Sequence, residues 1–247
     1  MCGIVGVIGW PINQPHLNAF HTLFYLNQLR GGDGVGLISA NSTTQMGRTR
    51  IDYATMRDHN MTAEMAQQYD EDYEKMTTQH PSLRAVVGRC RSATVGGVKT
   101  ENNHPIIVGD LIGVHNGTIK NTKYNVEGKT DSQVLYETID AIGWEDTYKE
   151  IENEPYALAW FDKTSDHLTL TRSKDRPLAC LKLNEDVLFF ASDWRMLDFM
   201  ARHHALPIPK GGLFTLMPDE MAKFDMKAHA VSTPVYVGPS VVEKKVG

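Results

Sequence analysis

The sequence of 247 residues is poor in cysteine and contains no Cys-x-x-Cys pair. Its three cysteines, Cys2, Cys90 and Cys180, are far apart and odd in number, so neither a disulfide framework nor a zinc site is indicated. The ten histidines show no reliable metal-ligand spacing either. A cytoplasmic, reducing environment is therefore expected, and no metal.

Long apolar runs and an excess of positive charge are also absent. No stretch approaches the length needed to cross a bilayer, so no membrane association is expected. The apolar N-terminal run is short, is not preceded by basic residues and includes glycines, which does not fit a signal peptide. The net charge of -5 argues against nucleic acid as a partner. Without repeats or low-complexity linkers, we expect one domain over 1–247.

Short apolar runs alternate with turn residues and predict many strands, with fewer helical segments between them. The expected strands lie at 3–9, 35–40, 84–88, 106–108, 111–114, 156–161, 168–172, 178–182 and 187–191. The expected helices lie at 16–30, 54–79, 131–142 and 193–204. Strands in hairpins with helices inserted predict an α+β layered domain rather than parallel βαβ units.

The expected helix at 54–79 carries an unusual stripe of methionine and tyrosine. Met61, Met65, Tyr69, Tyr73 and Met76 are spaced by fours and a three, which is typical of one helical face. Such a stripe is more often core filling than an adaptable docking surface, and both interpretations stay open here.

Cys2 stands next to the initiator Met1 and before the apolar residues Ile4 and Val5. If Met1 is removed, one residue carries both a thiol and a free α-amine. The amine has an unperturbed pKa near ~8, low enough to accept a proton from the thiol or a bridging water. The structural alternative is a small apolar residue that opens a buried strand.

Several polar or glycine-rich segments follow apolar runs, and each also has a purely structural explanation. Arg30 to Gly36 fits a helix end and a tight turn. Gly88 to Thr94 contains arginines that could clamp a carboxylate or lie on a solvated strand end. Asn102-Asn103-His104-Pro105 fits a polar turn.

Two further segments suggest donors and charges at defined places. Asn116-Gly117 is a common hairpin signal, but an Asn amide beside a Gly N–H also suits an oxyanion hole. Thr130 and Gln133 have the spacing of a helix capping box. Asp131 is not needed by that box, so it could stabilise the helix N-terminus or hold a substrate ammonium.

Taken in order, these segments resemble the class II glutamine amidotransferases, whose glutaminase domains have an N-terminal nucleophile. The resemblance is carried by Cys2-Gly3-Ile4, Arg-Gly-x-Asp, Gly-x-x-Arg-x-Ala-Thr, Asn-x-His-Pro, His-Asn-Gly-x-Ile-x-Asn and Thr-Asp-Ser, and it extends to about Leu197. It implies an αββα four-layer sandwich of two antiparallel sheets between helices.

The resemblance also implies roles for individual residues. It makes Cys2 the nucleophile, with its own amine as the base, and places Arg30 beside it. It assigns the oxyanion hole to Asn116 and Gly117. At the substrate it places Arg91 on the α-carboxylate of glutamine and Asp131 on the α-ammonium. Further members of the substrate-binding set are then Thr94, His104 and His115.

The sequence departs from the family pattern at four positions outside this minimal set. It has Gly34 where relatives often have Ser, Ser92 and Val95 where they have an aromatic residue and His, and Gln133 where they have Glu. These differences concern closure of the substrate loops and coupling to an acceptor rather than the nucleophile.

The implied reaction is hydrolysis of the glutamine side-chain amide, which needs no cofactor. About fifty residues follow Leu197, so the expected ammonia acceptor is a synthase on another chain. Two alternatives remain: hydrolysis of a different γ-glutamyl amide, and a non-catalytic glutamine-sensing or interaction module.

Overall fold

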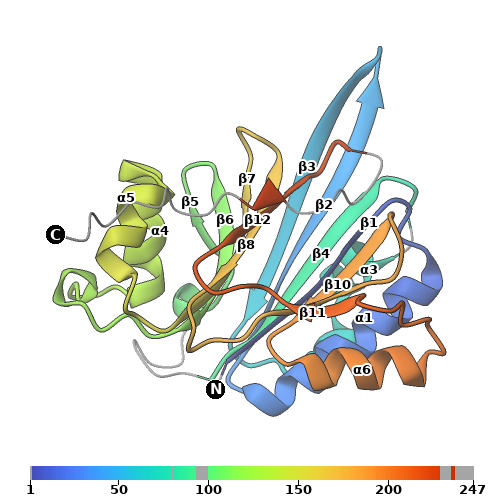
Figure 1. The fold of residues 1–247 in the computed structure, drawn as a ribbon, viewed down its shortest axis with the longest axis horizontal. Helices are drawn as coiled ribbons and strands as arrows, with labels where there is room; N and C mark the ends of the chain where they lie inside the picture. Colours follow the sequence, from blue (N-terminus) through green and yellow to red (C-terminus); the bar gives the residue numbers. More distant parts are fainter. Residues whose placement is uncertain (1, 79, 93–99, 229–234, 237–247) are drawn as a thin grey trace, which may run out of the picture.

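The computed structural model describes residues 2–78, 80–92, 100–228 and 235–236. Among these, two antiparallel sheets form (Figure 1). Sheet A has the order β11-β9-β10-β1-β4-β2-β3 and sheet B the order β13-β12-β8-β7-β6-β5. The strands of sheet A are β1 (Gly3–Gly9), β2 (Val35–Gln45), β3 (Arg48–Asp58), β4 (Leu83–Cys90), β9 (Ala179–Lys182), β10 (Val187–Ala191) and β11 (Leu213–Thr215). Those of sheet B are β5 (Ile106–Val108), β6 (Leu111–Gly117), β7 (Tyr156–Asp162), β8 (His167–Arg172), β12 (Met221–Asp225) and β13 (Val235–Tyr236).

Helices cover the outer face of each sheet, as Figure 1 shows for α1 and α6 on sheet A and for α4 and α5 on sheet B. The helices on the sheet A side are α1 (Gln14–Asn27), α2 (Ala63–Tyr69), α3 (Glu71–Thr77) and α6 (Trp194–His203). Those on the sheet B side are α4 (Asp131–Ile142) and α5 (Trp144–Ile151). The predicted αββα sandwich is therefore confirmed.

The alternation of side chains along β1 explains why this strand sits at the centre. Val5 and Val7 belong to the apolar cluster between sheet A and its helices, while Ile4 and Ile8 belong to the cluster between the two sheets. Both faces of β1 are therefore buried, as a continuous apolar run requires. A third apolar cluster, which includes Tyr136, packs α4 and α5 against sheet B.

The prediction of one helix at 54–79 is wrong. Residues 54–58 belong to β3, and the helical part is divided into α2 and α3. Asp70 adopts an extended conformation (φ -101°, ψ 114°) at the end of α2, and its side chain caps α3 by accepting from Tyr73 N. A capping aspartate competes with helix continuation, which is why the even spacing was misleading.

The break at Asp70 also divides the methionine and tyrosine stripe. Tyr73 and Met76 are 2% and 6% exposed and belong to the core beneath α1, whereas Met65 and Tyr69 are 44% and 77% exposed. Core filling therefore holds for α3, and α2 leaves part of the stripe on the surface.

Most other elements match the sequence prediction to within a few residues. The strand at 3–9 and the helix at 131–142 match β1 and α4 at both ends. The hairpin partner β3 and the short helix α5 were not expected. No helix in the described part of the chain is long and apolar enough to span a membrane.

Candidate active site

Cys2 lies immediately before the central strand β1 and is 8% exposed. Its thiol sulfur accepts a hydrogen bond from the backbone N–H of Ser92 at 3.3 Å, and it lies equally far from the carbonyl oxygen of Ser92. The next residue, Gly3, pairs with Cys90 at the end of β4. The start of β1 and the end of β4 therefore hold the thiol at the end of the central strands of sheet A, where the polar segments meet.

Arg30 follows α1 in the short 3₁₀ helix Gln28–Arg30 and reaches the same place. Its Nε donates to the backbone carbonyl of Cys2 at 3.2 Å, and its Nη1 lies 3.9 Å from a carboxylate oxygen of Asp193. Burial lowers the pKa of Arg30, and the negative charge of Asp193 opposes that shift. Arg30 thus joins the end of α1 to the backbone of Cys2.

Asn116 and Gly117 come from the other sheet, at the end of β6. The Nδ2 of Asn116 donates to the hydroxyl of Ser192 at 3.4 Å, and the same hydroxyl accepts from the N–H of Ile4 at 2.9 Å. Gly117 has no room for a side chain, because a Cβ there would overlap the carbonyl oxygen of Pro155. The two sheets therefore bring the Asn116 amide and the start of β1 together through one serine.

A polar pocket opens between these strand ends. Its lining residues are Cys2, Arg89, Arg91, Ser92, Asn102, His104, Gly117, Thr130, Asp131 and Ser132. Of the sequence-predicted site residues, the pocket brings together Cys2, Gly117, Arg91, Asp131 and His104, whereas Arg30, His115 and Asn116 are not among its lining residues. Thr94 lies outside the described residues, so its expected role stays a prediction.

Arg91 reaches the pocket from the segment after β4, which is held by backbone hydrogen bonds. Arg91 N donates to the carbonyl of Gly34, and Asp33 N donates to the carbonyl of Arg91, at 2.8 and 2.9 Å. Burial lowers the pKa of Arg91, as does the charge of Arg89, while nearby negative groups that include Asp131 oppose the shift. The guanidinium is thus buried in the pocket wall beside a second arginine and several negative groups, and an arginine in a pocket wall suits an anionic ligand group.

Asp131 begins α4, and the capping box that precedes it forms as predicted. Thr130 Oγ1 accepts from Gln133 N at 3.2 Å, and Gln133 Oε1 accepts from Thr130 N at 2.7 Å. One carboxylate oxygen of Asp131 accepts from the N–H of Ile119 at 2.8 Å. Asp131 therefore has a structural partner that the sequence did not indicate, in addition to its place in the pocket wall.

The two histidines are buried, and burial favours the neutral form of both rings. His104 is 3% exposed, and burial lowers its pKa well below the ordinary value. His115 is fully buried, and burial lowers its pKa to about 4, although the charge of Asp131 acts in the opposite direction. The Nδ1 of His115 pairs with the hydroxyl of Ser132 at 2.9 Å. Among the described residues, His115 Nε2 and both ring nitrogens of His104 have no hydrogen-bond partner.

Arg89 also belongs to the pocket; the sequence indicated it only as one of two arginines around Cys90 and gave it no role of its own. It is 4% exposed, its Nε donates to the carbonyl of His115 at 2.8 Å, and its Nη1 has no partner within the described structure. The sequence did contain a signal for Arg89, because residues two apart on a strand lie on the same face. Since Arg91 was expected at the substrate, Arg89 could have been expected near it.

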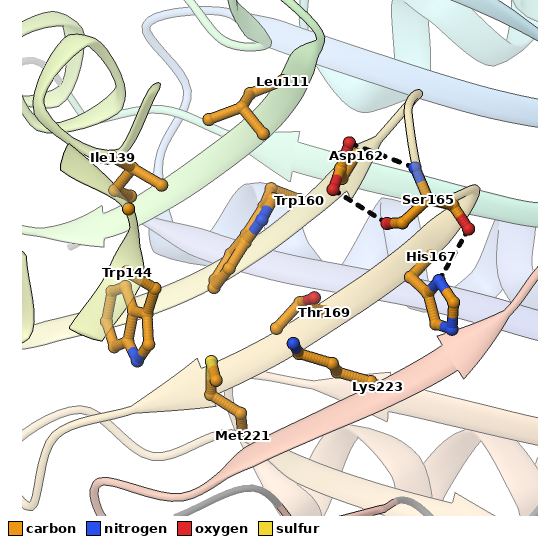
Figure 2. Close-up of a pocket in the computed structure, with 11 residues that line it drawn as sticks. Leu111, Ile139, Trp144, Trp160, Asp162, Ser165, His167, Thr169, Met221 and Lys223 are labelled. Atoms are coloured by element: carbon orange, nitrogen blue, oxygen red, sulfur yellow. Dashed lines mark hydrogen bonds between the residues drawn. The ribbon is translucent and has the colours of Figure 1, made fainter. Parts of the chain in front are cut away.

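A second pocket, shown in Figure 2, lies between sheet B and the helices α4 and α5 and contains none of the predicted site residues. It has a volume of about 330 Å³ and an apolar floor built on Trp144 and Trp160, whose ring centroids are 5.4 Å apart. Asp162 on its rim accepts hydrogen bonds from its own turn, including that from Ser165 Oγ at 2.8 Å. It contains none of the three cysteines and none of the arginines that the motifs indicate, so the smaller polar pocket is the candidate active site.

Within the described residues, no group of three or more His, Cys, Asp or Glu side chains could hold a metal ion. The polar pocket instead combines a thiol, backbone and amide donors, two arginines and one carboxylate. Such a set can attack a carbonyl carbon, stabilise an oxyanion and hold a zwitterion.

No protein-family model matches the chain. The chain is 29% identical over 255 residues to the glutamine–fructose-6-phosphate aminotransferase (isomerizing) of Gluconobacter oxydans strain 621H. That alignment covers 95% of this chain but only 38% of the relative.

Two solved structures have the same fold. The allosteric regulatory enzyme of purine biosynthesis superimposes with a TM-score of 0.58 at 19% identity, covering 91% of this chain and 47% of that one. The glutamine phosphoribosylpyrophosphate amidotransferase of B. subtilis, complexed with ADP and GMP, gives a TM-score of 0.58 at 18% identity with the same coverage. The sandwich fold and the similarity to these amidotransferases agree with the resemblance of the ordered motifs to class II glutamine amidotransferase domains of the N-terminal-nucleophile type.

Proposed function

We propose that this chain hydrolyses the side-chain amide of L-glutamine to glutamate and ammonia, with Cys2 as the nucleophile. The observation that carries this proposal is the meeting of Cys2, Gly117, Arg91 and Asp131, from four separate segments, around one polar pocket. A binding module for glutamine would need Arg91 and Asp131 but no thiol between them. The proposed domain is 1–247, because segments from both halves of the chain are interleaved in the two sheets.

The first half of the reaction forms a thioester. Removal of Met1 frees the α-amine of Cys2, which accepts the thiol proton, and the sulfur bonds to the amide carbon of glutamine. The negative charge that develops on the amide oxygen is stabilised by Asn116 Nδ2 and by the N–H of Gly117, with each donor contributing roughly 3–4 kcal/mol. The C–N bond then breaks while the α-ammonium returns its proton to the leaving nitrogen, and ammonia departs.

The second half regenerates the enzyme. Water, deprotonated by the α-amine, attacks the γ-glutamyl thioester, and the C–S bond breaks to give glutamate and the Cys2 thiol. Arg91 and Asp131 keep the α-carboxylate and α-ammonium in place throughout, so their contribution is the same in the ground state and the transition state.

The nucleophile can be tested by mass spectrometry. We expect intact mass to show loss of Met1, and a diazo-ketone analogue of glutamine to add once, at Cys2. The other two cysteines serve as internal controls: both are fully buried, and burial raises the pKa of the Cys90 thiol to about 12 and also raises that of Cys180. Labelling at either of them, or active protein that keeps Met1, would overturn the assignment.

A matched variant separates catalysis from folding. Cys2→Ala should keep the fold, because loss of one small buried thiol costs only about 1 kcal/mol, and should abolish glutamine hydrolysis. Comparing glutamine with γ-glutamyl conjugates tests the substrate. A conjugate hydrolysed with the higher kcat/KM would favour the γ-glutamyl amide hydrolase, and glutamine binding without turnover would favour the sensing module.

The ammonia acceptor is the second part of the proposal. The Gluconobacter relative is named as an aminotransferase between glutamine and fructose-6-phosphate, and the chain matches 38% of it. We propose that ammonia from Cys2 passes to an acceptor enzyme on another chain. Low glutamine turnover alone, stimulated by a copurifying enzyme and its substrate, would support this, whereas full partner-independent turnover would favour a stand-alone hydrolase.

A further inference from the structure

Strand β4 carries two arginines that are equally buried but donate hydrogen bonds to different acceptors. Arg84 and Arg89 are 3% and 4% exposed. Each uses its Nε in a hydrogen bond of 2.8 Å, and the Nη1 of each has no hydrogen-bond partner among the described residues, although the Arg84 guanidinium also lies over the Trp10 ring. Arg84 binds the hydroxyl of Ser42, whereas Arg89 binds the backbone carbonyl of His115.

The acceptor of Arg89 lies directly before the proposed oxyanion hole. His115 is followed by Asn116 and Gly117 at the end of β6. Arg89 itself pairs with Ile4 in β1, two residues after Cys2. Its side chain therefore crosses from the sheet that carries the nucleophile to the strand that carries the oxyanion donors.

The hydrogen bond from Arg89 to the carbonyl of His115 is suited to holding the end of β6 in place. It joins a charged donor to a buried carbonyl, and charge-assisted bonds are shorter and roughly twice as strong as neutral ones. A second hydrogen bond between sheet A and the end of β6, from Asn116 Nδ2 to Ser192, is longer at 3.4 Å and uses the amide that must turn to the substrate. Arg89 is thus the link that can stay in place while Asn116 changes partner.

We propose that Arg89 is a positioning residue, whose hydrogen bond to the carbonyl of His115 sets the distance between Cys2 and the oxyanion donors Asn116 and Gly117. This inference rests on the proposed glutaminase activity. It assigns to Arg89 an effect on the transition state rather than on the affinity for glutamine, which distinguishes it from Arg91.

The test compares Arg89→Met and Arg89→Lys with Arg84→Met. We expect Arg89→Met to lower kcat by about 10–100-fold, the range caused by small misplacements of reacting groups, with KM for glutamine within about threefold of the wild type. Arg89→Lys, which keeps a charged donor, should recover part of kcat. Arg84→Met removes an equally buried arginine from the same strand and should leave kcat per folded molecule unchanged.

Three kinetic outcomes would overturn the proposal. A raised KM with unchanged kcat would make Arg89 a substrate-binding residue. An equal loss of kcat in Arg84→Met would make the effect one of general stability. Unchanged kcat and KM in a folded Arg89→Met variant would show that Arg89 has no role in the reaction.

Hydrogen exchange gives a readout that does not depend on turnover. Arg89→Met, or Arg89→Lys if the former does not fold, should increase amide exchange over 115–118 while leaving 3–9 protected. No local increase would overturn the positioning role. A wild-type protein that cannot hydrolyse glutamine would instead refute the proposed function, and the exchange pattern would still report on Arg89.

Discussion

The side-chain amide of Asn116 donates to the hydroxyl of Ser192, with 3.4 Å between Nδ2 and Oγ. Ser192 follows β10 in sheet A, whereas Asn116 lies in β6 of sheet B, so this contact connects the two sheets. The bond is long for its type, and breaking it costs less than breaking a short one. The amide is therefore both held near β1 and available to a developing oxyanion.

Asn116→Ala should lower kcat for glutamine hydrolysis by about 10²–10³, with a modest change in KM, because the donor acts mainly on the transition state. Steady-state kinetics measure this directly. Ser192→Ala is the matched control: it removes the resting partner of the amide but keeps the amide, so its loss of kcat should be smaller. A larger loss in Ser192→Ala would make the serine, rather than Asn116, the more important group.

Asp131 accepts a hydrogen bond from Ile119 N and lines the polar pocket, and two variants separate this structural role from the proposed role at the substrate. Asp131→Asn removes the negative charge but keeps an oxygen that can accept from Ile119 N, so we expect a raised KM for glutamine and nearly unchanged thermal stability. Asp131→Ala removes both and should raise KM and also destabilise by roughly 1–3 kcal/mol, since a buried N–H loses its acceptor. If Asp131→Ala lowered Tm while both variants kept the wild-type KM, the carboxylate would be a structural cap only.

The fold and most of the candidate site could be predicted from the sequence because their signals are local. The apolar run at 3–9 and the capping box at Thr130 each specify an element without reference to the rest of the chain. The order of the motifs along the chain then indicated the resemblance to class II glutamine amidotransferases. The prediction of one long helix at 54–79 was wrong in its helical part because Asp70 ends α2 and caps α3, which the helical spacing of the apolar residues does not reveal.

Contacts between the sheets could not be predicted in the same way. The partners Arg89 and His115, and Asn116 and Ser192, are joined only after two sheets stack, and no periodicity along the chain encodes that stacking. The position of Arg89 at the end of a strand indicated only that a positive charge lies near the site. Its acceptor, the carbonyl of His115, could be found only from the tertiary structure.

Acid should destabilise the protein through its buried histidines. Burial lowers the pKa of His115 from about 6.5 to about 4 and also holds that of His104 well below its ordinary value, so the unfolded chain binds more protons than the folded one as the pH falls below 6.5. Stability contributed by the neutral rings is complete above pH 6.5 and is lost progressively toward pH 4. Thermal unfolding across this range should show a falling Tm.

The histidine origin of this acid sensitivity can be checked with His115→Gln, which cannot take up a proton. Its Tm, although lower at neutral pH, should fall less steeply between pH 6.5 and 4 than that of the wild type. An identical slope in the variant would mean that other groups cause the acid effect.

The division of the stripe at Asp70 predicts opposite results for two tyrosines of similar sequence context. Tyr73 is buried, lies 5.5 Å from Phe24 between ring centroids and pairs through its hydroxyl with His21 Nδ1 at 2.8 Å. Tyr73→Asp places a charge in that core and should destabilise by more than about 4 kcal/mol, enough to unfold the domain. Tyr69→Asp changes a residue that is 77% exposed and should shift stability by no more than about 0.5 kcal/mol.

Urea unfolding measures the stability of both variants. Tyr69→Asp should also keep basal glutamine hydrolysis, since Tyr69 lies on α2 and outside the polar pocket. Loss of the fold in Tyr69→Asp would contradict the division, because it would show that α2 and α3 bury a single continuous face.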